Sequence, residues 1–379
     1  MRPLPFIIIL LALNHIAFAG CRVTVTLYAI SLKASALTVG TLMALNALLP
    51  ALLSVATGRW IDRQGISKPM LIGSAGVGLG TLLPFLLPHQ ATLYFTCIIV
   101  GLSFMFINVA VYHAVGEMSP AADRPVNFSY VALGFSISTF IAPLLSGVMI
   151  DHLGHRITFF ILALFTLLPV IALSAKLLPD TRHHRAAAET GQRDVFDLLK
   201  KAELRRLFLI VTIISVAWDV YSFAIPIHGS NIGLSASAIG IVMGAFAAAT
   251  FVVRLIMPFL ATQLKPWPLL AIALLLTAIS YLTLPFTTGI LPLMGLMFLL
   301  GLGLGAPQPM VLTLLHHEAP VGRAGEALGF RTTLINSSQT VMPLIFGAVG
   351  TALGLAPLFW SVGLVALAGS AIAKSRKGQ

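Results

Sequence analysis

Charged side chains are scarce in this sequence. Asp, Glu, Lys and Arg make up 9% of its 379 residues, whereas a soluble globular domain carries roughly 25%. The hydrophobic share is 58% and the mean hydropathy is +0.97. This composition excludes a water-soluble enzyme and predicts a protein that buries its apolar surface in a lipid bilayer.

Cysteines and acidic residues are also few. The two cysteines, Cys21 and Cys97, lie in apolar stretches and indicate neither a disulfide framework nor a metal site. Twelve acidic residues stand against 23 basic ones, which leaves a net charge of +11. Because the basic residues occupy short connectors rather than one soluble face, the excess indicates membrane orientation and no nucleic-acid partner.

Long hydrophobic runs are abundant. At about 20 apolar residues for each crossing, they predict an all-α polytopic membrane protein with twelve transmembrane helices. Their many Gly, Pro and Ala residues suit a membrane, because small side chains let neighbouring helices approach closely. The predicted spans are 5–29, 36–57, 69–88, 91–114, 126–149, 157–178, 206–228, 236–259, 267–286, 290–314, 325–350 and 353–373.

Lys and Arg fall mainly on one side of this topology. Eighteen lie in the even-numbered connectors and the termini, and Lys33 and Arg156 lie on the opposite side. Arg22, Arg254 and Arg331 fall within predicted spans. By the positive-inside rule, this asymmetry predicts a multi-pass protein of the cell inner (plasma) membrane with both termini in the cytoplasm.

The sequence repeats itself at a shift of 200 positions. The matches lie in the predicted helices 2, 4 and 5 and again in helices 8, 10 and 11, so they predict two six-helix halves. The halves are 1–178 and 206–379. The main matched pairs are Gly40 with Gly240, Met43 with Met243, Gly101 with Gly301, Ser138 with Ser338, Pro143 with Pro343, and Gly147 with Gly347.

The longest polar stretch, 179–205, is the predicted cytoplasmic linker between the halves. Within it, Val195, Leu198, Leu199 and Ala202 recur at helical spacing among charged residues. This pattern predicts a short amphipathic helix on the inner membrane surface. The alternative is a solvated linker without regular structure.

Two parallel six-helix halves joined by a cytoplasmic loop resemble the architecture of the major facilitator superfamily, whose members bind substrate near the midplane of the bilayer. The segment after the second span resembles the loop 2–3 signature of that family, with matches at Gly58, Asp62, Arg63 and Gly65. It departs from the signature at the two positions after Gly65, where a basic residue is usual. The resemblance implies that Asp62 and Arg63 help to close the cytoplasmic side.

The sequence also resembles the twelve-helix efflux branch of this family, the drug/proton antiporters, with degenerate motifs. Their helix 4 arginine is replaced by Thr96 or Cys97 ahead of Gly101. Their glycine-rich element in helix 5 reads Ala-Pro-Leu-Leu-Ser-Gly at 142–147 here. Membership of the superfamily is therefore well marked. The retained small residues favour drug export, whereas the missing arginine and glycines count against it.

Asp219 is the only acidic residue well inside a predicted span. A charge at bilayer depth costs about 2.5–3.5 kcal/mol on insertion scales, so such a residue is a candidate for function. We expect Asp219 to carry protons or contact substrate, and the alternative is a structural acid in an ion pair. Arg22 is its predicted partner in a gate, with snorkelling to the outer headgroups as the alternative.

Other polar and aromatic side chains within the spans are candidates for a substrate cavity. Each of them could instead join helices by hydrogen bonds or pack in the core. For Arg331 and Arg254, snorkelling of the side chain toward the inner headgroups is the preferred interpretation. The cavity candidates are Asn14, His15, Asn46, Asn108, Tyr112, His113, Trp218, Tyr221, Gln308, Arg331, Asn336 and Gln339.

Together these features predict a secondary active transporter that moves a small organic molecule across the inner membrane by alternating access, with proton-coupled efflux as its activity. One alternative is uptake or exchange of an anionic metabolite through an arginine-containing site, and another is a non-transporting receptor or scaffold. No phosphate loop or catalytic cluster is present, so we expect no enzymatic activity, no cofactor and no metal. The expected partners are the small-molecule substrate, protons and the lipid bilayer, and we expect a monomer.

Overall fold

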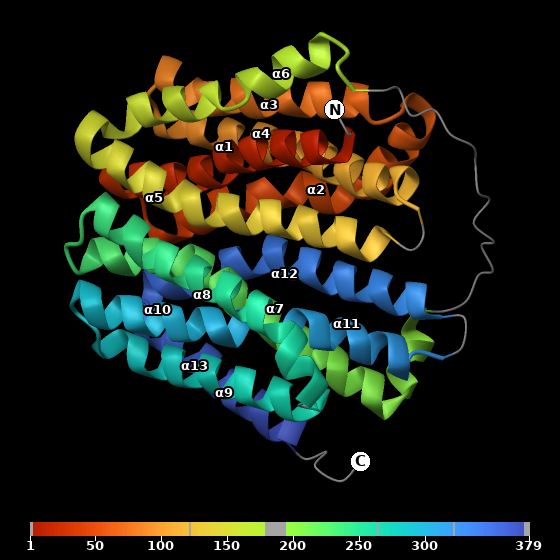
Figure 1. Cartoon of the computed structure of the whole chain (residues 1–379). Coiled ribbons are helices and arrows are strands. Elements are labelled where there is room, and N and C mark those ends of the chain that lie inside the picture. The colour runs from red at the N-terminus through yellow and green to blue at the C-terminus, as the bar shows by residue number, and fades with distance from the viewer. Residues whose placement is uncertain (1–2, 121–122, 179–194, 264, 321–322, 375–379) are drawn as a thin grey trace. The chain divides into compact units, whose positions relative to one another are not determined.

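The protein is helical in every regular element that its structure describes (Figure 1). The computed structural model describes residues 3–120, 123–178, 195–263, 265–320 and 323–374. Within these ranges ten stretches are long and apolar enough to cross a membrane. The predicted all-α membrane architecture is therefore confirmed.

Among the described residues there are thirteen α-helices and two short 3-10 helices, η1 and η2. In chain order they are α1 (Pro3–Ser31), α2 (Ala36–Gln64), α3 (Ser67–Leu86), α4 (Gln90–Met118), α5 (Arg124–Leu164), α6 (Leu167–Ser174), η1 (Val195–Lys200), α7 (Ala202–Asn231), α8 (Ala236–Gln263), α9 (Pro266–Thr283), η2 (Leu284–Phe286), α10 (Ile290–Gly305), α11 (Pro307–Glu318), α12 (Ala324–Leu353) and α13 (Ala356–Lys374).

The ten apolar stretches correspond to twelve crossings. One stretch, Val126–Ser174, has 49 residues, which would reach about 74 Å as a single helix, more than twice the roughly 30 Å thickness of the hydrocarbon core. At Gly154 the backbone leaves the helical region, with φ 80° and ψ 163°, so the stretch divides into two spans near the predicted boundary between 149 and 157. The 30-residue α12 is the remaining crossing.

The chain divides into two compact units. Unit 1 contains 1–34, 41–188 and 235–241, and unit 2 contains 35–40, 189–234 and 242–379. Helix α8 thus begins in unit 1 and continues in unit 2, while α2 begins in unit 2 and continues in unit 1. The domain boundaries predicted at 178 and 206 stay a prediction.

Within unit 1, α1 packs mainly against α5, and α3 packs mainly against α4 (Figure 1). The part of α5 just before Gly154 also holds the first turn of α8. The carboxylate of Asp151 accepts hydrogen bonds from the backbone N–H of Ala236 (3.0 Å) and Ser237 (2.8 Å). These are donors that a helix leaves unsatisfied at its N-terminus. Because a Cβ atom at Gly240 would collide with the carbonyl oxygen of Pro143, only glycine permits this approach.

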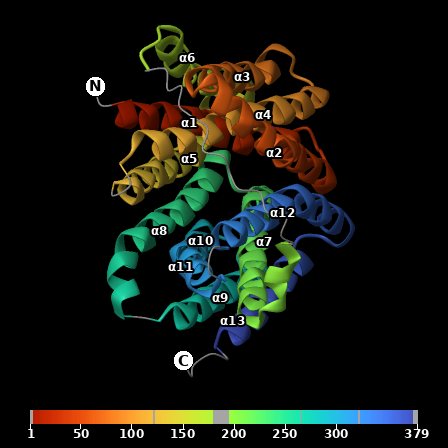
Figure 2. The ribbon, with the colours of Figure 1, turned by 90° about the vertical axis from the view of Figure 1, so that its right-hand side faces the viewer.

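Within unit 2, α13 packs mainly against α9, and α12 packs mainly against α7 (Figures 1 and 2). The first turn of α2 lies against α12 in the same way as α8 lies against α5. The backbone N–H of Leu37 donates to the hydroxyl of Thr351 at 2.9 Å, and a Cβ atom at Gly40 would collide with the carbonyl of Pro343. Each of these four positions lies 200 residues from its counterpart in unit 1, although the acceptor is a threonine here and an aspartate there. The repeat therefore preserves a helix contact.

The part of the predicted linker that the structure describes folds onto unit 2. Residues 195–200 form a 3-10 helix rather than the expected amphipathic α-helix. Leu198 is 1% exposed and belongs to the apolar core of unit 2, which includes Leu204 and Leu315. It therefore packs on protein, whereas the prediction placed it on the membrane surface. The rest of the linker, 179–194, lies outside the described residues.

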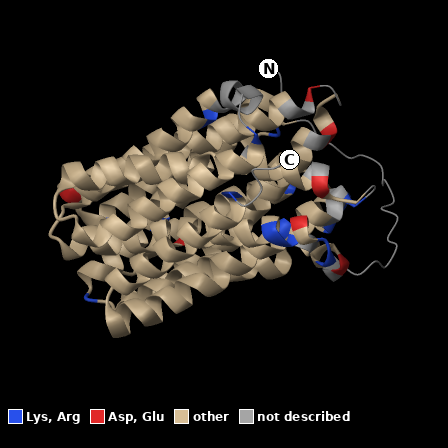
Figure 3. Cartoon of the chain, turned by 90° about the horizontal axis from the view of Figure 1, so that it is seen from below, with Lys and Arg blue, Asp and Glu red and all other residues tan. Residues whose placement is uncertain are grey.

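Charged residues gather at the ends of the helices, and the lengths of the helices are nearly free of charge (Figure 3). A bilayer imposes this distribution, because charge is tolerated at the headgroups and costly in the hydrocarbon core. The few charged residues within the helices of unit 2 are therefore the place to look for a functional site.

Candidate functional site

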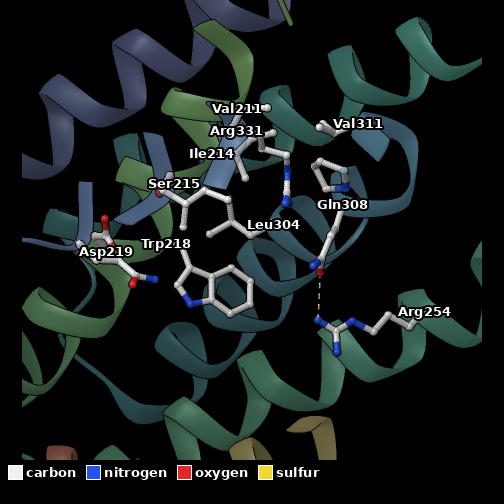
Figure 4. Close-up of a pocket in the computed structure, with 13 residues that line it drawn as sticks. Val211, Ile214, Ser215, Trp218, Asp219, Arg254, Leu304, Gln308, Val311 and Arg331 are labelled. Carbon is white, nitrogen blue, oxygen red and sulfur yellow. Dashed lines mark hydrogen bonds between the residues drawn. The ribbon is translucent and has the colours of Figure 1, made fainter. Parts of the chain in front are cut away.

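A cavity of about 230 Å³ lies among the helices of unit 2 (Figure 4). Its lining comes from α7, α8, α10, α11 and α12. The volume is below the range of about 300–1,000 Å³ typical of small-molecule sites, so it suits a small molecule or one end of a larger one. Five of the predicted site residues line it: Trp218, Asp219, Gln308, Arg331 and Gln339.

Asp219 is a buried acid in the middle of α7, with 8% of its surface exposed. Its carboxylate accepts a hydrogen bond from the hydroxyl of Ser338 on α12 at 2.5 Å. Ser338 is itself buried. Because a buried carboxylate needs hydrogen-bond donors when it is ionised, this hydroxyl supports the charged form.

Trp218 presents its indole ring to the same cavity. Phe246 on α8 holds the ring in an edge-on contact, with centroids 5.1 Å apart. Phe246 also stacks on Tyr221, at 3.7 Å. The phenol of Tyr221 donates to the carbonyl of Met243 at 3.3 Å, and the residue is only 4% exposed. Tyr221 is thus a core residue that supports Trp218 rather than a lining residue.

Two arginines contribute the positive charge of the cavity. Arg254 of α8 donates to the side-chain oxygen of Gln308 over 3.4 Å, and Arg331 of α12 has its Nε buried without a hydrogen-bond partner among the described residues. Figure 4 shows both side chains running toward Gln308. Gln308 stands in the first turn of α11, where Pro307 starts a new helix after α10.

Sequence reasoning set Arg254 aside as a snorkelling residue, but it lines the cavity. It was missed because its position near the predicted inner end of a span fits both interpretations. The signal that could have found Arg254 is that few ionisable residues fall within the spans. Two arginines and one acid are the only ionisable residues that line this cavity in the described part of the chain. The arrangement can hold a negative group on one part of its wall and a positive group on another.

Three predicted cavity residues of unit 1 join helices by hydrogen bonds. The amide of Asn14 donates to the Leu10 carbonyl at 2.9 Å and to the Ser74 hydroxyl at 3.0 Å. That of Asn46 donates to the Cys97 carbonyl at 3.3 Å. The third is His15, whose ring Nδ1 lies 2.6 Å from the hydroxyl of Ser138 on α5.

His15 also sits among aromatic rings. Its ring lies 4.8 Å from that of Phe135, 5.3 Å from that of Phe104 and 5.9 Å from that of Phe18, between centroids. These contacts are those of a packed histidine, which was the alternative to a substrate contact. None of these unit 1 residues lines the cavity described above.

The remaining candidates are not among the residues that line the cavity, and their roles stay predictions. Tyr112 is 45% exposed, and its ring lies 6.1 Å from that of Phe128. This group comprises Asn108, Tyr112, His113 and Asn336.

Arg22 is anchored within unit 1. Its guanidinium lies 5.9 Å from the centre of the Phe18 ring, and one of its nitrogens lies 3.9 Å from the sulfur of Met43. The predicted pairing of Arg22 with Asp219 stays a prediction.

The loop 2–3 signature is helical over most of its length. Helix α2 continues to Gln64 and ends at Gly65, where φ is 74°. Gly58 and Arg63 therefore lie on the helix rather than in a connector, because glycine in the left-handed conformation ends a helix at that point. Arg63 is exposed in the last turn, and the side chain of Asp62 lies outside the described residues.

Comparison with known proteins defines the class. The sequence matches the profile of the Major Facilitator Superfamily in two overlapping stretches, 7–336 and 207–375. Together with the helical architecture and the absence of strands from the described residues, this match defines a polytopic membrane transporter. The chain belongs to the Major Facilitator Superfamily.

Several curated relatives are named multidrug resistance proteins. Multidrug resistance protein 2 of Bacillus subtilis is 28% identical over 201 residues, which is 52% of this chain and 50% of that protein. Multidrug resistance protein MdtG of Klebsiella pneumoniae is 25% identical over 334 residues, 84% of this chain and 79% of that protein. The human vesicular acetylcholine transporter is 28% identical over 151 residues, 40% of this chain and 28% of that protein. The chain therefore spans half or less of the first and last of these relatives.

Solved structures share the fold. A bacterial homologue of the human lysosomal transporter Spinster superposes with a TM-score of 0.75 at 15% identity, over 98% of this chain and 95% of that one. A POT family transporter in complex with a thioalcohol-conjugated peptide gives 0.81 at 14% identity, over 99% and 96%. The nucleoside transporter NupG gives 0.77 at 15% identity, over 98% of both chains. At these identities the likeness concerns the fold alone.

Proposed function

We propose that the protein is a proton-coupled secondary transporter that exports a small organic molecule by alternating access, with Asp219 as the proton-carrying residue. The observation that carries the proposal is an acid in the middle of a membrane-spanning helix that lines a cavity. An ionisable residue at that depth is costly, and proton relays in transporters are built from such acids.

Asp219 has the surroundings that a reversible proton site needs. Its carboxylate is buried, and Ser338 supplies a donor to its ionised form. It also lines a cavity, so a bound molecule can reach it. A positively charged group bound there would compete with the proton for the same carboxylate, and that competition is the basis of exchange.

The names of the relatives support export as the direction. Two of the relatives described above are multidrug resistance proteins, of Bacillus subtilis and Klebsiella pneumoniae. The exporter motifs themselves are degenerate here, with Ala142-Pro143 in place of Gly-Pro, so the proposal of export rests on the relatives rather than on these motifs. We propose the inner membrane as the location, with both termini in the cytoplasm, from the distribution of Lys and Arg.

Proton movement across reconstituted vesicles tests this function. Purified protein is placed in proteoliposomes, candidate organic cations and carboxylates are added, and the internal pH is followed. We expect at least one compound to drive proton movement, and Asp219→Asn to abolish it. Asp197→Asn is the matched control, because Asp197 lies on η1 in an exposed ion pair with Lys200 at 2.6 Å, away from the cavity.

Uptake or exchange of an anionic metabolite is the second candidate. It is favoured by the two arginines, Arg254 and Arg331, that line the cavity beside a single acid. In that case carboxylates alone would drive proton movement, with protons moving in the same direction as the anion. Absence of any substrate-driven proton movement would contradict proton coupling in both forms.

A further inference from the structure

We propose that the cargo of the unit 2 cavity is a small zwitterion with a flat apolar part. Its ammonium group binds Asp219, its carboxylate binds between Arg254 and Arg331, and its apolar part lies on Trp218. This inference rests on the proposed function, in which cargo and proton exchange at Asp219, and it names the class of the cargo.

The arginine side of the cavity calls for an anion. The Nε of Arg331 is buried and makes no hydrogen bond among the described residues. Arg254 lines the same part of the wall and donates to the side-chain oxygen of Gln308 across 3.4 Å. A buried guanidinium nitrogen without an acceptor is costly, and a carboxylate is the acceptor whose planar geometry matches it. A neutral or purely cationic cargo would leave this donor unsatisfied.

The acid side of the cavity calls for a cation. Asp219 contributes a carboxylate to the same lining, and Ser338 donates to it. Figure 4 shows Asp219 and Arg254 on different sides of Trp218. The negative and positive parts of the wall are therefore separated by an aromatic surface, and a molecule with charges at two ends and an apolar middle complements all three.

The coupling supports a zwitterion over a simple anion. When Asp219 takes up a proton, the three ionisable side chains of the lining change from a net charge of about +1 to about +2. A simple anion would bind more tightly to the protonated form and travel with the proton. The ammonium group of a zwitterion competes with the proton at Asp219, as exchange requires, while its carboxylate is held by the arginines.

Four related probes separate the contributions of the two charges. L-Phenylalanine carries both charges, its methyl ester only the positive one, N-acetylphenylalanine only the negative one, and the N-acetyl methyl ester neither. Binding is measured on the detergent-purified full chain as the ligand-dependent rise of the thermal unfolding midpoint, which follows ligand concentration relative to Kd. A cooperative transition in each variant shows that it is folded.

We expect wild-type protein to bind phenylalanine at least roughly tenfold more tightly than either singly charged probe, since each charged end adds a charge-assisted hydrogen bond. Arg331→Gln should weaken the binding of phenylalanine and N-acetylphenylalanine but leave the binding of the methyl ester unchanged. Asp219→Asn should weaken the binding of phenylalanine and the methyl ester but leave the binding of N-acetylphenylalanine unchanged. Arg205→Gln, an exposed arginine at the start of α7 that does not line the cavity, is the control and should preserve the wild-type order.

Two results would overturn the zwitterion. If the methyl ester or the N-acetyl acid bound as tightly as phenylalanine itself, one end of the cavity would not be used. Binding of none of the four probes at millimolar concentration would also count against it. Arg254→Gln provides a second variant in case Arg331→Gln fails to fold. Proton movement driven by some other compound, and lost in Asp219→Asn, would leave the proposed transport function standing in each of these cases.

Discussion

The hydroxyl of Ser338 is the described donor to the buried carboxylate of Asp219, at 2.5 Å. Both residues are less than 10% exposed, at 4% and 8%. A hydrogen bond to a charged group contributes about 1.5–3 kcal/mol, and its loss leaves the charge without that donor. The pair therefore holds α7 to α12 as well as serving the proposed proton site.

We expect Ser338→Ala to lower the free energy of unfolding by about 1–3 kcal/mol. The measurement is reversible denaturation in detergent. In a background of Asp219→Ala the same substitution should cost much less, because the carboxylate that it serves is gone. Equal costs in the two backgrounds would show that the serine contributes through packing alone.

At this scale the sequence predicted the acid and offered four other lining residues among its cavity candidates, but it did not show which candidates share one cavity. Asp219 stands out because a charge in an apolar run is rare and costly. Arg254 and Arg331 were each compatible with snorkelling to a headgroup, and a sequence does not state which way a helix turns its side chains. For Asn14 and Asn46 the sequence left a cavity and a bond between helices both open, and their amides are used between helices of unit 1.

At the scale of helices, the contact between α5 and α8 rests on Asp151. Its carboxylate accepts two hydrogen bonds from the first turn of α8. A side chain that caps a helix N-terminus contributes about 0.5–2 kcal/mol. Thr351, 200 residues later, does the same for α2 with a single bond.

We expect Asp151→Ala to destabilise the protein by about 0.5–2 kcal/mol and to speed hydrogen exchange at the amides of Ala236 and Ser237. Asp151→Asn keeps a side-chain oxygen as acceptor and should lose less stability than Asp151→Ala. Thr351→Val removes one hydrogen bond to the first turn of α2, where Asp151→Ala removes two to that of α8, so it should reduce the stability of its helix contact less. If Asp151→Asn and Asp151→Ala lost equal stability, the charge of Asp151 rather than its hydrogen bonds would be the stabilising feature.

A second prediction at this scale concerns Gly154, the point where α5 changes from one span to the next. Its φ of 80° disfavours any residue with a Cβ, although a Cβ there would meet nothing within 4 Å. We expect Gly154→Ala to lower the free energy of unfolding by about 1 kcal/mol or more, through the backbone alone.

The matched control for Gly154 is Gly295→Ala. Gly295 lies inside α10, and a Cβ there would also meet nothing within 4 Å. Since its backbone is helical, alanine should stabilise it by about 0.5–1 kcal/mol. Thermal unfolding of the two variants should therefore shift in opposite directions, and a shift in the same direction would refute the backbone explanation.

The existence of the helices was predictable, and their interruptions were less so. Long apolar runs give spans because lipid requires every backbone group to be satisfied within the helix. The apolar spacing at 195–200 predicted an amphipathic α-helix on the membrane surface. The segment is a 3-10 helix instead, and its Leu198 is buried in the core of unit 2. The repeat pairs Gly40 and Gly240 marked real close contacts, yet only the structure shows which helices they join.

At the scale of the whole molecule, the distribution of Lys and Arg predicts which ends of the helices face the cytoplasm. Lys33 and Lys68 lie exposed just beyond the opposite ends of α2. The native cysteines Cys21 and Cys97 are both buried, so they should add little background to cysteine labelling.

We expect Lys33→Cys to react with a membrane-impermeant maleimide in intact cells, and Lys68→Cys to react only after the membrane is opened. The readout is mass-tag labelling of the full chain, with the unsubstituted protein as the control. Labelling of Lys68→Cys from outside intact cells would reverse the proposed orientation.

Helices α2 and α8 each start in one compact unit and continue in the other. Neither unit is consequently a contiguous piece of the polypeptide. A gene divided within 179–194 would yield two products, each lacking a helical turn that the other supplies. Such fragments should be recovered as stable protein when a cell synthesises both together, and should be degraded when either is made by itself.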